Sequence, residues 1–125
     1  MAERLQVLLA EDDDQLRDTL AFHLSEEGYD VTTAADGHTA IPLLHGRPFG
    51  LVILDLKMPY IDGFQVLKFI KTTFPKTKVI ILTAYTDLAS ITKCKELGAD
   101  EVVAKPYSFP HLFSVIAGVM KGEGG

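Results

Sequence analysis

The chain has 125 residues, of which 47% are hydrophobic and 23% charged, and its net charge is -5. This length and composition predict one ordinary globular domain and exclude an intrinsically disordered chain. The negative charge is opposite to that of a protein that grips a nucleic-acid backbone, so we expect no direct contact with nucleic acid. A single cysteine excludes a disulfide framework and a cysteine-based zinc site.

No apolar run approaches the ~20 residues that a membrane-spanning helix needs, so we expect no membrane contact. The beginning of the chain shows no apolar leader, and together with the single thiol this predicts a cytoplasmic protein. We expect one domain over residues 1–121. The glycine-rich end, residues 122–125, is interpreted as a tail, a linker stub or a remnant of cloning.

The first half of the chain predicts three strands separated by two helices. The strands are apolar runs rich in Val, Ile and Leu, at residues 5–10, 29–34 and 50–54. Leucines recur every fourth residue between 16 and 24, and Gly28 is a natural helix end. The second helix, over residues 39–45, is the weaker prediction, because Pro42 removes a backbone donor and should shorten or kink it.

The second half of the chain predicts a third helix and then two more strand–helix units. The strands are the apolar runs at residues 78–82 and 101–104. Helical spacing over residues 64–70 indicates the third helix, and a fourth, over residues 88–97, ends at Gly98. Ser108 can cap a fifth helix, whose apolar residues run from 112 to 119.

Strand and helix alternate five times, which predicts an α/β fold: a parallel sheet with helices on both faces, in three layers. Right-handed crossovers leave few topologies, and the flavodoxin-like strand order 2-1-3-4-5 is the common five-stranded solution. In that order the first and third strands end side by side at the switch point, where open sheets of this kind bind ligands. We therefore expect the functional residues just past those two strands.

Carboxylates occupy both of these positions. Glu11 and Asp12 follow the first strand, and Asp55 follows the third. Like charges this close repel unless a cation neutralises them, and an all-oxygen ligand set suits Mg²⁺. Asp13 and Asp14 fit this cluster and a capping role at the first helix equally well.

Two further polar residues follow the neighbouring strands, Thr83 after the fourth and Lys105 after the fifth. Taken singly, Thr83 fits a helix cap and Lys105 fits a surface charge. Together with the carboxylates they form a different pattern, because a carboxylate nucleophile, a metal, a hydroxyl and a lysine are the parts that phosphoryl transfer needs.

The strings VLLAEDD, LVILDLKMPYIDGF, VIILTA and ADEVVAKP resemble the receiver domain of two-component response regulators over about residues 5–120. The resemblance implies that Asp55 accepts a phosphoryl group from the phosphohistidine of a histidine kinase or phosphotransfer protein. It implies Mg²⁺ as cofactor, bound by Asp12, Asp55 and the backbone carbonyl of Lys57, with Glu11 as an acidic partner that often acts through water.

The same resemblance assigns Thr83 as a switch hydroxyl and Lys105 as the cation that pairs with the phosphoryl oxygens. It implies a cis bond between Lys105 and Pro106. The domain would be a signalling module, catalysing only its own phosphorylation and dephosphorylation. Its further partner would be an output domain or a downstream effector, and a phosphorylation-dependent homodimer stays open.

The chain departs from the family pattern at two positions near these residues. Val102 stands where the family often has an aromatic residue, and Tyr85 and Tyr107 are the candidates to replace that ring. Tyr60 stands where the family commonly has glycine after Met-Pro, and tyrosine is the less favourable residue at a positive φ.

Three other functions are compatible with parts of the sequence. A flavin-binding carrier of the same topology would place a phosphate beside Glu11, which would repel it. A phosphohydrolase with an aspartate nucleophile would resemble a family that has a second aspartate where this chain has Lys57. A degenerate receiver acting as a phosphorylation-independent binding scaffold would usually lack an acid, the acceptor or the lysine. Cys94 and the four histidines are interpreted as structural or surface residues.

Overall fold

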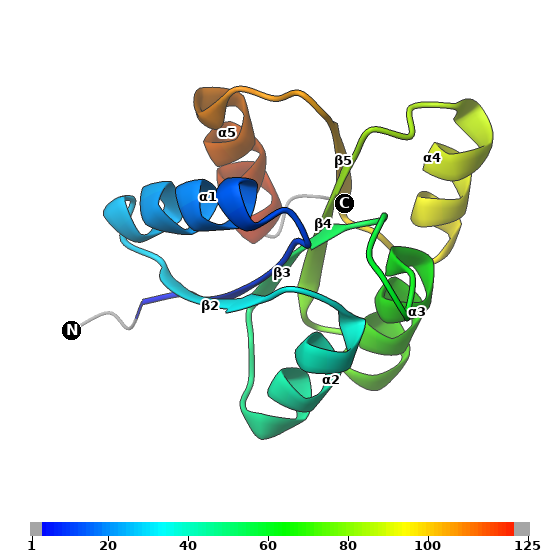
Figure 1. Cartoon of the computed structure of the whole chain (residues 1–125), viewed down its shortest axis with the longest axis horizontal. Coiled ribbons are helices and arrows are strands. Elements are labelled where there is room, and N and C mark those ends of the chain that lie inside the picture. Colours follow the sequence, from blue (N-terminus) through cyan, green and yellow to red (C-terminus); the bar gives the residue numbers. More distant parts are fainter. Residues whose placement is uncertain (1–3, 122–125) are drawn as a thin grey trace.

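The computed structural model describes residues 4–121 and consists of five strands that alternate with five helices (Figure 1). The interpretation of residues 122–125 as a tail therefore concerns residues outside the described part. The strands are β1 (Gln6–Ala10), β2 (Asp30–Ala34), β3 (Leu51–Asp55), β4 (Lys78–Thr83) and β5 (Glu101–Ala104). The helices are α1 (Asp14–Glu26), α2 (Gly37–Gly46), α3 (Gly63–Thr73), α4 (Leu88–Glu96) and α5 (Phe109–Met120).

All five strands are parallel, in the order β2-β1-β3-β4-β5, which confirms the predicted doubly wound topology. Helices α1 and α5 cover one face of the sheet, and α2, α3 and α4 cover the other (Figure 1). Strand β3 lies at the centre and is buried along its whole length, because helices pack on both of its faces. The predicted strands and helices are therefore all present, with bounds that differ by a few residues.

Each helix begins with a side chain that satisfies a free backbone N–H of the first turn. The capping oxygens belong to Asp13, Asp36, Asp62, Asp87 and Ser108, and each accepts from the N–H three residues ahead. Gly28 and Gly98 follow α1 and α4 with φ of 99°, the left-handed conformation that glycine adopts most easily. The short polar side chains between the apolar runs thus set where the helices start and stop.

Of the two effects predicted for Pro42, a shorter or a kinked second helix, the shortening is wrong. Helix α2 runs through Pro42, begins two residues earlier than predicted and ends one residue later. A proline inside a helix removes one intrahelical hydrogen bond, and here the Asp36 cap and the burial of Ala40 and Leu44 against the sheet offset that loss.

Within residues 4–121, none of the helices combines the length and the apolar character needed to cross a bilayer. Cys94 is buried in the core between the sheet and α4, and this burial raises the pKa of its thiol. The cysteine is therefore placed as a structural residue, as expected.

Candidate active site at the carboxyl end of the sheet

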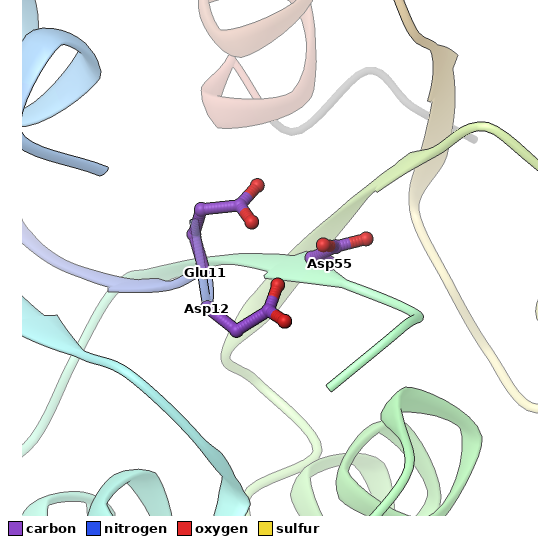
Figure 2. Close-up of side chains that lie close together, drawn as sticks. All are labelled: Glu11, Asp12 and Asp55. Atoms are coloured by element: carbon purple, nitrogen blue, oxygen red, sulfur yellow. The ribbon is translucent and has the colours of Figure 1, made fainter. Parts of the chain in front are cut away.

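The parallel register brings the carboxylates together. Ala10, the last residue of β1, pairs with Leu54 of β3, so Glu11 and Asp55 occupy the next position on neighbouring strands. Glu11, Asp12 and Asp55 each offer a carboxylate oxygen within 4.8 Å of the others (Figure 2). The cluster predicted from the switch point is thus present in the structure.

Two of the three carboxylates are nearly inaccessible to solvent. Glu11 is 1% exposed and Asp55 is 5% exposed, whereas Asp12 is open to solvent. A buried carboxylate needs hydrogen-bond partners, and backbone donors supply some of them. The N–H of Asp13 donates to Glu11 Oε2 over 3.1 Å, and the N–H of Lys57 donates to Asp55 Oδ1 over 3.2 Å.

Lys105 bridges the two buried carboxylates. Its Nζ lies 2.8 Å from Glu11 Oε1 and 3.1 Å from Asp55 Oδ2. The lysine follows β5, two strands away from β3 in the sheet, and its backbone N–H donates to the carbonyl of Thr83 over 2.8 Å. The peptide bond between Lys105 and Pro106 is cis, as expected.

The charges in this cluster do not balance. Three carboxylates and the one ammonium that contacts two of them leave two negative charges in excess. Although Asp12 is exposed, loss of some of its hydration beside the cluster raises its pKa, and the hydrogen bond with Glu11 and the charge of Glu11 act in the same direction. Desolvation alone would lower the pKa of Lys105, but the hydrogen bond that its ammonium donates to Glu11 and the negative charge of Asp55 outweigh this effect and raise that pKa.

Thr83 is the buried last residue of β4 and lines the same cavity. Its hydroxyl oxygen accepts the N–H of Tyr85 over 2.8 Å, which leaves the hydroxyl proton to donate elsewhere. The cavity has a volume of about 440 Å³. It is lined by Glu11, Asp12, Asp13, Asp55, Lys57, Thr83, Ala84, Tyr85 and Lys105. All six residues predicted for the site line this one cavity.

The carboxylates fit a hard divalent cation. Oxygen ligands around octahedral Mg²⁺ lie about 2.1 Å from the ion, so neighbouring ligand atoms are about 3.0 Å apart and opposite ones about 4.2 Å apart. The separation of up to 4.8 Å in the cluster is close to this spacing, and the excess of two negative charges is what one such ion cancels. The all-oxygen donor set excludes the softer metals that prefer thiolate or imidazole.

The two roles left open for Asp13 and Asp14 are now separated. Asp13 is the N-cap of α1, and its side chain accepts the N–H of Leu16. Asp14 is exposed and pairs with Arg17 in the first turn of α1. Asp13 lies at the cavity wall, and Asp14 does not line it.

One contact at the site, made by Arg17, was not anticipated from the sequence. Arg17 donates through Nη1 to the backbone carbonyl of Glu11 over 2.9 Å, a contact whose only sequence signal is helical spacing from the acid cluster.

Tyr85 lines both this cavity and a smaller one of about 100 Å³ beside Val102. The hydroxyl of Tyr107 is buried without a hydrogen-bond partner among the described residues. Replacement of the missing ring by Tyr85 or Tyr107 stays a prediction.

The fold and the site together define a doubly wound α/β domain whose switch point carries a carboxylate cluster with the spacing to hold a metal ion. Residues 7–117 match the model of the response regulator receiver domain, and the chain belongs to that family. The carboxylate cluster at the ends of β1 and β3 is what the resemblance in the sequence implied.

Relatives and solved structures agree with this assignment. The chain is 35% identical to the probable chemotaxis protein CheY of Rhizobium etli, over 95% of both chains. A CheY-like receiver domain protein from Methanospirillum hungatei superposes with a TM-score of 0.93 at 26% identity, over 96% of both chains. The BeF3-activated receiver domain of DrrB superposes with a TM-score of 0.85 at 28% identity, over 95% of this chain and 99% of that one.

Other relatives are much longer than this chain. It is 39% identical to the probable transcriptional regulator ycf27 of Galdieria sulphuraria, over 93% of this chain but 45% of the relative. It also covers only 24% of the response regulator protein FleR of Pseudomonas aeruginosa, at 34% identity. The family therefore contains receiver domains as nearly whole proteins and as parts of longer ones.

Proposed function

We propose that this chain accepts a phosphoryl group from the phosphohistidine of a histidine kinase or phosphotransfer protein onto Asp55, in a Mg²⁺-dependent reaction. The observation that carries the proposal is the bridge that Lys105 makes between Glu11 and Asp55 inside the carboxylate cavity. A lysine held against the acceptor, beside an excess of negative charge, suits a site that binds a cation and then a phosphoryl group.

In the transfer step, a carboxylate oxygen of Asp55 attacks phosphorus. The new P–O bond forms as the P–N bond to the donor imidazole breaks, and the electron pair of that bond returns to the imidazole nitrogen, which takes up a proton. Burial of Asp55 limits the access of water, and the N–H of Lys57 holds one of its oxygens in place. Bound Mg²⁺, held by Asp12, Asp55 and the Lys57 carbonyl with Glu11 through water, would neutralise charge on the carboxylates and the transferring group.

After transfer, the contacts of two residues change. Lys105 leaves the carboxylate oxygen of Asp55 and pairs with a phosphoryl oxygen, because the added group brings about -1.5 to -2 charges. Thr83 turns its hydroxyl proton toward another phosphoryl oxygen. The Lys105 N–H is bonded to the Thr83 carbonyl, so a shift at either residue moves the ends of β4 and β5 together. These new contacts exist only in the phosphorylated state, and they shift the population between two conformations.

We propose that residues 1–121 form this switch and that it controls an output domain or a downstream effector protein. The domain would act in the cytoplasm, where kinases have access to ATP, and would remove its own phosphoryl group by hydrolysis. We propose no direct nucleic-acid contact by the domain, in keeping with its net charge of -5. A homodimer that forms on phosphorylation is a further part of the proposal.

The first experiment is intact-mass spectrometry after incubation with acetyl phosphate and Mg²⁺. We expect a single phosphoryl adduct on the wild type, none after chelation of Mg²⁺ by EDTA, and none on Asp55→Asn. Asp14→Asn is the matched control, because Asp14 is an exposed carboxylate outside the cavity, and it should take up the group like the wild type.

An adduct on Asp55→Asn at the wild-type rate would contradict the assignment of the acceptor. A wild type that takes no phosphoryl group from acetyl phosphate is tested next for binding of beryllofluoride. Failure of both would favour the binding-scaffold alternative, in which the domain works without phosphorylation.

A further inference from the structure

Tyr60 has an unusual backbone conformation. Its φ is 72°, and it is the one non-glycine with a positive φ within residues 4–121. The N–H of Ile61 donates to the carbonyl of Pro59 over 2.9 Å, which makes Tyr60 the central residue of a γ-turn with positive φ. This form of the turn is rare and strained, and a tyrosine there is less stable than a glycine would be.

Burial of the Tyr60 side chain does not offset this strain. The residue is 79% exposed, and its ring contacts the ring of His38 at the start of α2, with centroids 5.2 Å apart. The fold therefore gains little from a large side chain at this position.

The loop on either side of Tyr60 is held tightly. Met58 is buried. Ile61 packs closely against α2: a Cβ added to Gly37 would lie 2.9 Å from the Cβ of Ile61. A Cβ on Gly63 would lie 2.5 Å from the Cα of Leu56. These contacts hold the loop and turn the Tyr60 ring outward on a rigid support.

The position of Tyr60 identifies what it can contact. The loop connects Asp55, at the end of β3, to α3, and Lys57 in the same loop lines the carboxylate cavity. A protein that donates a phosphoryl group must bring its phosphohistidine into this cavity, so its surface must cover the surrounding residues. A small donor such as acetyl phosphate enters without covering them.

We propose that Tyr60, supported by His38, is a contact residue for the protein that donates the phosphoryl group, and that it sets the affinity for this donor without taking part in the chemistry. The inference rests on the proposed function of Asp55. Tyrosine is enriched among residues that dominate binding energy at interfaces, because it brings a large rigid surface at a low cost in side-chain entropy.

The test separates the ring from the backbone strain with three variants. Tyr60→Phe keeps the ring, Tyr60→Ala removes the ring and keeps the strain, and Tyr60→Gly removes both. The probe is a panel of phosphorylated histidine-kinase catalytic cores from the source organism, of which the fastest donor to the wild type is kept.

We expect the KM for this donor to rise at least tenfold in Tyr60→Ala and Tyr60→Gly and to stay within twofold in Tyr60→Phe. The kcat with the kinase and the rate with acetyl phosphate should stay within twofold in all three. Tyr60→Gly should melt about 3–5 °C above Tyr60→Ala, because it relieves the strained φ.

An unchanged KM in both Ala and Gly variants would overturn the inference. A KM that recovers in Tyr60→Gly would also overturn it, because the backbone and not the ring would then matter. The inference would also be overturned if no kinase in the panel transferred its phosphoryl group faster than acetyl phosphate does. A wild type that accepts phosphoryl groups from neither kind of donor would instead overturn the proposed function, so the acetyl phosphate arm distinguishes the two failures.

Discussion

A lysine–carboxylate cluster lies at each end of the sheet, and the two differ in charge balance. At the amino end, Asp100 pairs with Lys71 at 2.9 Å and lies 3.9 Å from Lys78, and its Oδ2 also accepts the N–H of Val79 over 2.8 Å. At the carboxyl end, Lys105 pairs with two of the three clustered carboxylates, and no other ion pair reaches this cluster within residues 4–121.

The comparison shows that similar ion pairs can serve different purposes. The amino-end cluster has more positive than negative charge around one carboxylate, and Asp100 makes a backbone hydrogen bond that ties β5 to β4. The amino-end cluster needs no further cation, and its contacts stabilise the folded state. The carboxyl-end cluster is over-supplied with negative charge, which costs free energy until a cation binds. Charge balance, more than residue type, separates a cluster that is complete by itself from one that can take up a cation.

The largest effect expected from this difference is stabilisation by Mg²⁺ through the carboxyl-end cluster. At free Mg²⁺ of about 100 times Kd, the free energy of unfolding should rise by about 2.7 kcal/mol. Asp12→Ala should weaken binding at least tenfold, which removes at least about 1.3 kcal/mol of that increment at the same concentration. Asp100→Asn should keep the full increment.

Urea unfolding with and without Mg²⁺, together with calorimetric titration, measures both quantities. Equal Mg²⁺ affinity in the wild type and Asp12→Ala would remove Asp12 from the ligands. Loss of the increment in Asp100→Asn would mean that the two ends of the sheet do not act separately.

The next effect is on stability without Mg²⁺, and its sign should differ between the two ends. Asp100→Asn should lower the free energy of unfolding by about 1–3 kcal/mol, because Lys71 and the Val79 N–H lose a charged acceptor. Asp55→Asn should raise it, because one of the excess negative charges is removed. Urea unfolding in EDTA measures both, and a loss of stability in both variants would contradict the contrast in charge balance.

The smallest effect concerns Tyr107, which packs against the apolar core and whose phenol is influenced by the charges of the carboxyl-end cluster. Burial is the main cause that raises the pKa of Tyr107 to about 12, from an ordinary value of 10.0. The folded state therefore favours the neutral phenol. The stability this contributes is complete below pH 10 and is lost as the pH rises toward 12.

The free energy of unfolding of Tyr107→Phe should decline less steeply with pH over this range than that of the wild type. The variant should be no less stable at neutral pH, because the hydroxyl has no hydrogen-bond partner among the described residues. Denaturant unfolding at several pH values between 9 and 11.5 compares the slopes. Identical slopes would show that the phenol ionises as it does in the unfolded chain.

Most of the fold could be predicted because its signals are local. The apolar runs, Gly28, Gly98 and the Ser108 cap each act within one element, and alternation of strand and helix then restricts the topology. The exception is α2, where the penalty of Pro42 is local but the burial that offsets it comes from the sheet.

The sequence predicted which residues gather at the carboxyl end of the sheet, but it did not predict the contacts between them. Strand ends can be read from the sequence, so Glu11, Asp55, Thr83 and Lys105 could be placed at one edge. Whether Asp13 and Asp14 belong to the cluster or to the start of the first helix could not be read, because both residues fit either role until the first turn of α1 is built.

The sequence by itself determined the order of the elements, the parallel sheet and the set of polar residues at its carboxyl end, since these follow from short-range patterns and from the limited ways of connecting parallel strands. Only the tertiary structure decided that Lys105 bridges Glu11 and Asp55, that Asp100 is balanced by two lysines, and that Tyr60 faces outward on a strained turn. These contacts join residues from different elements, or depend on how a loop is held by its neighbours. Side-chain distances and burial arise only when the whole core is packed.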